Sequence, residues 1–195
     1  MKIYDIRQEV FSCTVYPGDP KPEKKTTCSL DAGDVCNLTA LAMCAHNGTH
    51  IDAPFHFLRD GKTVDRMDLG VFVGDCYVAR HDGDVLAADA QTILQGADGA
   101  ERILIAGDAT VTEAAAEVFA HSGIKLIGNE SQTVGPENAP MRVHKILLGQ
   151  GIALLEGVVL KDVPQGRYFL SAAPLNLGGA DGAPCRAYLI DWETV

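Results

Sequence analysis

The stretch RILIAGDATVTEAAAEVFAHSGIKLIG, residues 102–128, decides the fold class, because it predicts a strand, a helix and a second strand in succession. Its first five residues, 102–106, form a short apolar run that stops at a glycine, and a similar run at 124–128 closes the stretch. Short apolar runs bounded by turn residues are typical of buried strands. The two runs are therefore predicted to be parallel strands joined by a right-handed βαβ crossover.

The middle of this stretch carries helix signals at both ends. Thr110 and Glu113 have capping-box spacing, in which the hydroxyl accepts from an early helix amide and the carboxylate reaches back. The expected helix covers 114–121, and a glycine two residues later can close it. A second crossover is expected from a helix-like segment at 144–148 and a strand at 152–158.

Outside these units the sequence predicts mainly strands, although residues 36–44 fit either a strand or a helix. The other expected elements are a strand or hairpin at 3–15, an exposed connection or edge strand at 21–27, a strand at 71–80, a short helix at 89–94, and strands at 168–173 and 185–190. No repeat or linker divides the chain. We therefore expect residues 1–195 to form one α/β domain with a parallel βαβαβ portion and additional antiparallel strands.

The bulk composition excludes several classes of partner. The 195 residues carry a net charge of −10, which argues against binding to nucleic acid or to anionic membrane surfaces. No apolar run approaches the ~20 residues that a transmembrane helix needs. The N-terminus does not resemble a signal peptide, and the six cysteines form no C-x-x-C pair. These features predict a cytoplasmic protein with reduced and mostly buried thiols.

The run HNGTHIDAPFH at residues 46–56 holds three of the six histidines, with a carboxylate between them. His46 and His50 have helical spacing, but a glycine, two β-branched residues and a proline favour an extended or looped backbone. In an extended segment His50 and Asp52 point to the same side, and His56 is close enough to face the same cavity. Solvated loop histidines are the alternative, but four ligand-type residues within eleven favour a metal site.

Two residues further along fit the same chemistry less specifically. Glu156 lies in the otherwise apolar run 153–158, where a buried carboxylate would be costly unless a cation relieved that cost. Strand alternation could instead turn Glu156 towards solvent. His144 stands alone in a helical segment, and such histidines are more often surface or core residues than ligands. The residues alone therefore leave the roles of Glu156 and His144 open.

The run at 46–56 resembles the signature of the cyclase-like metal hydrolases, a family that includes bacterial kynurenine formamidase and isatin hydrolase. All seven fixed positions match, in the pattern His46-x-Gly48-Thr49-His50-x-Asp52-x-Pro54-x-His56. The resemblance extends to an aromatic-Pro-Gly-Asp turn at 15–19, to His144-x-x-Leu147-Leu148 followed by Leu155-Glu156-Gly157, to Pro174-Leu175, and to Gly182-x-Pro184-x-Arg186. The chain length suits the shorter formamidase branch of the family.

The resemblance implies a fold, a cofactor and a role for each matched residue. The fold would be the family's swivelling β/β/α arrangement, and the assembly a homodimer or a larger homo-oligomer. Two divalent metal ions would lie side by side, usually zinc, with manganese as the other option. The implied roles are His46 and His50 on the first ion, His144 on the second, Asp52 and Glu156 bridging both, and His56 as general acid and base.

The implied reaction is hydrolysis of an amide bond by a metal-activated water. For an arylformamidase the substrate is N-formylkynurenine, which yields kynurenine and formate in tryptophan catabolism. Two positions depart from the formamidase pattern: Tyr16 replaces a tryptophan that would stack on the substrate ring, and Glu130 lies in an altered loop. Both are interpreted as substrate-binding residues. The alternatives are a hydrolase of a cyclic amide, lactone or ester, as in isatin hydrolase, and a non-catalytic metal- or ligand-binding member, against which His56 argues.

Four further residues have features that could suggest a function, but we assign none to them. Cys44 follows an apolar run and is interpreted as a buried core cysteine. Asp181 lies in a glycine-rich loop that resembles a phosphate loop only superficially, because the lysine and the Ser/Thr of that motif are missing. His81 and His121 are interpreted as surface residues.

Overall fold

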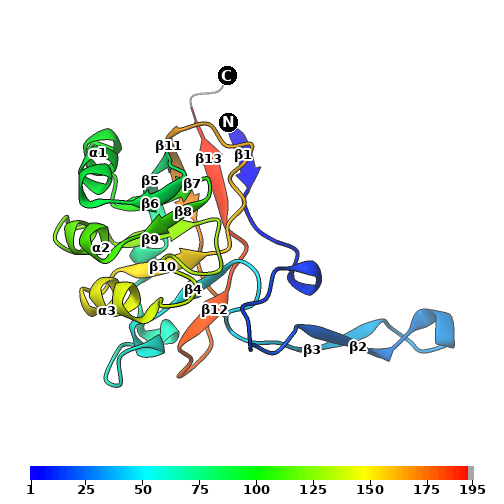
Figure 1. Cartoon of the computed structure of the whole chain (residues 1–195). Coiled ribbons are helices and arrows are strands. Elements are labelled where there is room, and N and C mark those ends of the chain that lie inside the picture. The colour runs from blue at the N-terminus through cyan, green and yellow to red at the C-terminus, as the bar shows by residue number, and fades with distance from the viewer. Residues whose placement is uncertain (193–195) are drawn as a thin grey trace.

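The computed structural model describes residues 1–192, which are organised around a mixed nine-stranded sheet (Figure 1). The four central strands are parallel and the flanking strands are antiparallel, which confirms the predicted α/β class. The strand order is β1 (Lys2–Asp5), β13 (Tyr188–Asp191), β11 (Gly166–Ser171), β5 (Val73–Arg80), β7 (Arg102–Ala106), β9 (Leu126–Asn129), β10 (Ala153–Glu156), β4 (His50–Asp52) and β12 (Gly182–Pro184).

Three helices, α1 (Ala87–Ala97), α2 (Glu113–Ala120) and α3 (Met141–Gly149), line up along one face of this sheet (Figure 1). Strand alternation separates two cores. Ile103 and Ile105 of β7 pack among the helices, whereas Leu104 packs on the opposite face. Both βαβ crossovers are present, since β7, β9 and β10 are parallel neighbours. Among the described residues no helix is long and apolar enough to span a bilayer.

The start of α2 differs from the sequence prediction. Thr112, not Thr110, is the N-cap residue, and its hydroxyl accepts a hydrogen bond from the Ala115 amide at 3.2 Å. Thr110 lies instead in a short extra strand, β8 (Ala109–Val111), which pairs in parallel with β6 (Gly83–Val85). The chain therefore makes one more strand pairing before it turns into the helix. That pairing moves the cap by two residues.

A two-stranded hairpin of β2 (Glu23–Cys28) and β3 (Leu38–Ala42) projects away from the sheet (Figure 1). The ambiguous segment 36–44 is thus a strand, and its apolar residues Leu38 and Leu41 are 54% and 61% exposed. The prediction of a buried core Cys44 is wrong, because the residue lies half-buried at the base of this hairpin. We call residues 23–42 the arm.

The structure differs from the sequence prediction in several smaller ways. The predicted N-terminal strand or hairpin at 3–15 is only the four-residue β1, followed by a 3-10 turn. The thiols are all free as expected, but of the six only that of Cys76 is buried. His121 is exposed and His81 is partly exposed. Single 3-10 turns lie at Val10–Ser12, Leu30–Ala32, Pro54–His56, Val64–Arg66 and Leu69–Val71.

Candidate active site

The site begins at the pairing of β4 with β10, near one end of the sheet (Figure 1). Ile51 points into the core on the face away from the helices, so His50 and Asp52 point to the helix face. The register places Glu156 directly opposite His50. Three ligand-type side chains therefore converge, and His144 approaches them from α3.

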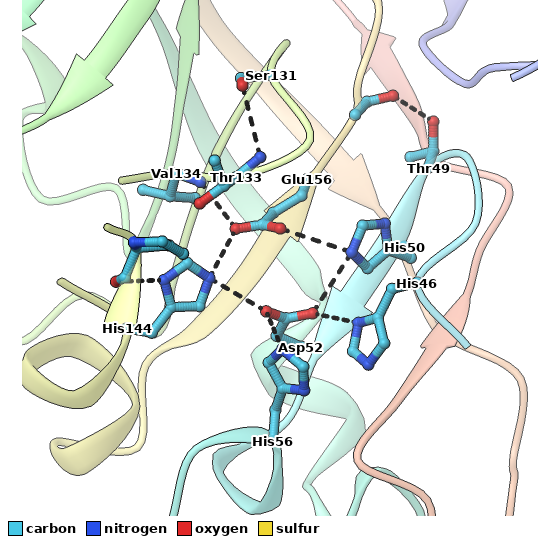
Figure 2. A network of polar contacts seen from close by, with 12 residues as sticks. His46, Thr49, His50, Asp52, His56, Ser131, Thr133, Val134, His144 and Glu156 are labelled. Carbon is cyan, nitrogen blue, oxygen red and sulfur yellow. Dashed lines mark hydrogen bonds and ion pairs between the residues drawn. The ribbon is translucent and has the colours of Figure 1, made fainter. Parts of the chain in front are cut away.

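The carboxylates of Asp52 and Glu156 lie between two imidazoles (Figure 2). Asp52 Oδ1 and Glu156 Oε2 are 3.4 and 3.5 Å from His50 Nε2. The other oxygens, Asp52 Oδ2 and Glu156 Oε1, are 3.4 and 3.1 Å from His144 Nε2. Each carboxylate thus presents one oxygen to each histidine. This arrangement gives two neighbouring groups of one nitrogen and two oxygens, related by shared carboxylates.

Backbone carbonyls fix the tautomers of both imidazoles. His50 Nδ1 lies 2.9 Å from the carbonyl oxygen of Gly48, and His144 Nδ1 lies 2.9 Å from that of Pro140. A carbonyl only accepts hydrogen bonds, so each Nδ1 carries a proton and donates it. Each Nε2 is then directed at the two carboxylates. Histidine ligands of metal ions are oriented in this way by an outer hydrogen bond on the second nitrogen.

Positive charge is favoured in this cluster at the position between the carboxylates of Asp52 and Glu156. Burial alone would lower the pKa values of His50 and His144, but the bonds to Asp52 and Glu156 outweigh it and raise both to about 10. Burial would raise the pKa of Asp52, yet the surrounding histidines hold it well below its usual range. Asp52 Oδ2 is buried, and within residues 1–192 it has an ion-pair contact of 3.4 Å with His144 Nε2 but no hydrogen bond. The donor set and this oxygen therefore fit a divalent cation.

Two further histidines extend the cluster towards the surface. His46 Nδ1 lies 2.8 Å from Asp52 Oδ1, on the same side as His50. His56 lies lower in the view of Figure 2, with its Nε2 3.9 Å from Asp52 Oδ2 and its side chain 27% exposed. The groups that could hold a metal ion include His46 with Asp52 and His56, and His50 with Asp52 and Glu156.

Asp181, for which the sequence analysis predicts no role, lies in this site. Its Oδ2 is 2.8 Å from His46 Nε2 and 3.0 Å from His56 Nδ1. The residue directly precedes β12, which pairs with β4 in a register that sets Gly182 opposite Asp52. A side chain at Gly182 would collide with the His46 ring, with its Cβ 2.8 Å from the ring carbon Cε1. The one sequence feature that points to Asp181 is its position directly before Gly182, where the family-like stretch Gly182-x-Pro184-x-Arg186 begins.

Thr49 ties the two halves of the site together. Its buried hydroxyl donates to the carbonyl of Gly157 at 2.6 Å and accepts from the amide of Gln8 at 2.9 Å. Gly157 directly follows Glu156 and has a φ of +68°, a conformation that favours glycine. Thr49, a motif residue that is not a proposed ligand, therefore anchors the strand that supplies Glu156.

A cavity of about 290 Å³ opens above these side chains. This volume lies near the lower end of the range for small-molecule sites, about 300–1,000 Å³. Tyr16 lines the cavity, and its hydroxyl donates to the Glu137 carbonyl at 2.6 Å. Gln132 and Thr133 line it as well. The oxygens Gln132 Oε1 and Thr133 Oγ1 are buried and have no hydrogen-bond partner in the described part of the chain.

The structure does not bring Glu130 to this cavity. Its carboxylate accepts hydrogen bonds from the backbone amides of Gly107 at 2.8 Å and Leu160 at 2.7 Å, which follow β7 and β10. Both carboxylate oxygens are used within the scaffold, so this placement does not support the predicted contact between Glu130 and a substrate. The loop that carries Glu130 does reach the cavity, but it does so through Gln132 and Thr133.

Comparisons with known proteins give one consistent picture. The family model named Cyclase matches residues 4–104. A kynurenine formamidase from Erythrobacter litoralis is 34% identical over 96% of this chain and 93% of its own length. A solved structure described as a potential metal-dependent hydrolase with cyclase activity superposes with a TM-score of 0.82 at 28% identity, over 96% of both chains. Isatin hydrolase A from Labrenzia aggregata shares the fold, with a TM-score of 0.83 at 20% identity over 96% of this chain and 93% of that one.

Proposed function

The chain belongs to the Cyclase family of metal-dependent hydrolases, and we propose that it is an arylformamidase that hydrolyses N-formylkynurenine to kynurenine and formate. One observation carries this proposal. Two buried carboxylates are shared between two imidazoles at the base of a small cavity, with a further histidine at its mouth. The kynurenine formamidases that are 34% identical over nearly the whole chain support the choice of substrate.

We propose that two divalent ions are held by His46 and His50 on one side and by His144 on the other. Asp52 and Glu156 would contribute to holding both, because each offers an oxygen to either side. Nitrogen and carboxylate donors suit zinc, with manganese as the alternative. Bound there, the ions would supply Lewis acidity and a water whose pKa is lowered towards ~7.

His56 is positioned to move the proton. Its Nδ1 faces the Asp181 carboxylate, so in the neutral imidazole the lone pair lies on Nε2, on the side of Asp52. That nitrogen can take a proton from the attacking water and return it to the leaving nitrogen of the substrate. An arylamine is a poor leaving group as an anion, so this donation is required for the bond to break. The His56 side chain is partly exposed, so a substrate could reach it.

The residues that line the cavity would recognise the substrate. Tyr16 offers an aromatic face, held in place by its bond to the Glu137 carbonyl. Gln132 Oε1 and Thr133 Oγ1 offer unpartnered polar atoms for the amino-acid part of the substrate. The small volume suits a formyl group, whose carbon carries only hydrogen. One second candidate is ring opening of a cyclic amide, since Tyr16 departs from the formamidase pattern at the position that would stack on the substrate ring.

We also propose that the protein is a cytoplasmic homodimer of single-domain subunits. The free cysteines support a reducing compartment. The arm supports the dimer, because an isolated two-stranded hairpin is marginally stable in water and Val35 at its tip is 98% exposed. A groove of about 700 Å³ at the base of the arm is lined by Phe11, Met43 and Leu175. In a two-fold contact the arm of each copy can occupy the groove of the other.

A substrate panel tests the function. Protein stripped with chelator and reloaded with zinc or manganese is assayed on N-formylkynurenine, isatin, aryl esters and lactones. We expect rapid release of formate from N-formylkynurenine and slow reaction of the others. Turnover of isatin or a lactone alone would assign the second candidate. No turnover of any compound by metal-loaded protein would refute both.

A further inference from the structure

We propose that Asp181 is a positioning residue that sets the tautomer and orientation of His56 and, with the same oxygen, orients the ligand His46. This inference rests on the proposed hydrolytic function and extends it to a residue outside both proposed ligand sets. It starts from one atom, Asp181 Oδ2, which lies 3.0 Å from His56 Nδ1 and 2.8 Å from His46 Nε2.

The first consequence concerns the proton on His56. An ionised carboxylate only accepts hydrogen bonds, so His56 Nδ1 must carry the hydrogen that it shares with Asp181. In the neutral imidazole the lone pair is then on Nε2, which lies 3.9 Å from Asp52 Oδ2, beside the paired carboxylates. The opposite tautomer would present an N–H to the reacting water and could not accept its proton. A carboxylate behind a catalytic imidazole fixes the tautomer in this way in other hydrolases.

The second consequence concerns His46. Because its Nε2 donates to Asp181, its Nδ1 is the nitrogen that faces Asp52 Oδ1, at 2.8 Å. The His46 and His56 rings lie close together, with their centroids 4.1 Å apart. One carboxylate therefore holds a proposed ligand and the proposed proton-transfer group in a fixed relation. Outer-shell partners of this kind typically contribute about 10–100-fold to metal affinity or activity.

The backbone around Asp181 is held well enough for this task. The Asp181 carbonyl accepts from the amide of Ala53, within the histidine motif, at 2.9 Å. The carbonyl of Ala180 accepts from Val64 at 2.9 Å, and Asp65 Oδ1 accepts from the Gly179 amide at 2.9 Å. These bonds join the loop to both ends of the segment that carries His56. The Asp181 side chain is 41% exposed, so it reaches the histidines from the solvent side of the site.

The two consequences make separable predictions for the Asp181→Ala variant. Loss of the bond to His46 should weaken metal binding, by about 10-fold or more. Loss of the bond to His56 should lower kcat by about 10–100-fold at saturating metal, with little change in KM. The kcat loss should vanish in a His56→Ala background, because there is no imidazole left to position. The loss of metal affinity should persist in that background.

Asp181→Asn and Asp65→Ala are the matched variants. Asparagine keeps an oxygen that can accept from both imidazoles but lacks the charge, so Asp181→Asn should fall between wild type and Asp181→Ala in both measurements. Asp65→Ala removes one anchor of the same loop and leaves the Asp181 carboxylate in place. The bonds of the Asp181 carbonyl to Ala53 and of the Ala180 carbonyl to Val64 still hold that loop, so kcat should stay within about two-fold.

The experiment combines kcat and KM at saturating zinc, zinc affinity by competition with a chromophoric chelator, and ¹⁵N NMR of the histidine side chains. We expect His56 in the zinc-loaded protein to be protonated on Nδ1 in wild type and to populate the other tautomer in Asp181→Ala. Equal kcat losses with and without His56, or an unchanged His56 tautomer, would overturn the proposal. Zinc affinity and NMR need no substrate, so a wrong substrate leaves both readouts intact.

Discussion

Glu156 lies directly opposite His50 in the antiparallel pairing of β10 with β4, and both side chains point to the helix face of the sheet. This register assembles the site from two distant parts of the chain. A slip of one residue would turn Glu156 to the other face and leave His50 without its carboxylate. Thr49 supports the register from the side, through its bond to the Gly157 carbonyl.

Replacing Glu156 by glutamine should remove metal binding while preserving the fold. Glutamine keeps the shape and can still accept from the Val134 amide, which now bonds Glu156 Oε1 at 2.8 Å. It lacks the charge that a shared cation needs. We expect metal affinity to fall by at least about 10-fold and activity to fall with it, measured by metal titration and by initial rates.

Glu130→Gln is the matched control, because it makes the same chemical change at a carboxylate outside the cavity. Its kcat at saturating metal should stay close to the wild-type value. Two backbone amides lose a charged acceptor, so the free energy of unfolding should fall by about 1–3 kcal/mol. If Glu130→Gln lost metal and Glu156→Gln did not, the assignment of the bridging carboxylate would be wrong.

His56→Ala should keep its metal and lose most of kcat. General acid–base catalysis typically contributes about 10²–10⁴-fold, so a fall of that size is expected. His56 is outside both proposed ligand sets, and its Nε2 lies 3.9 Å from Asp52 Oδ2, so its removal leaves the proposed ligands in place. Metal content by elemental analysis and steady-state kinetics on the same sample check both points. Normal turnover with metal bound would remove His56 from the proton transfer.

Without metal, the stability of the protein should depend on pH through the buried histidines. The pKa values of His50 and His144 are raised from 6.5 to about 10, so the stability they contribute is complete below about pH 6.5. It is lost as pH rises through about 10. Thermal unfolding of chelator-treated protein should therefore show Tm falling over that window.

Added zinc should reverse this trend, because a cation replaces the protons between the carboxylates and competes with them at low pH. Tm with zinc should exceed Tm without it by a margin that grows from pH 6 to pH 8. The same samples should recover activity on addition of zinc or manganese. Full activity of protein shown to be free of metal would contradict the cofactor assignment.

The parts of the fold that sequence patterns predicted are those governed by local signals. The apolar run 102–106 matches β7 at both ends, because five buried residues bounded by a glycine leave little freedom. The cap of α2 was misplaced because β8 depends on a pairing with β6 that no local pattern reveals. The prediction of a core Cys44 failed because a local pattern cannot show that the arm before it projects away from the nine-stranded sheet.

The same distinction applies to the site. His46, His50, Asp52 and His56 could be grouped from spacing alone, since they lie within eleven residues. Asp181 reaches them only through the pairing of β12 with β4, a long-range contact without a local signature. Within one loop, the turn after β9 decides that Glu130 faces the scaffold while Gln132 and Thr133 face the cavity. Which side chains of this loop face the cavity depends on backbone geometry rather than on residue type.

The arm gives the last prediction, which concerns assembly. Leu38 and Leu41 are largely exposed in the single chain, so charged substitutions there should hardly affect its own folding. If these side chains are buried on a second copy, Leu38→Lys with Leu41→Lys should convert a dimer to a folded monomer. Leu69→Lys, at a position 66% exposed outside the arm, should remain dimeric. Multi-angle light scattering at micromolar concentration distinguishes the two masses, and a monomeric wild-type protein, or a dimer unaffected by the double substitution, would show that the arm has another purpose.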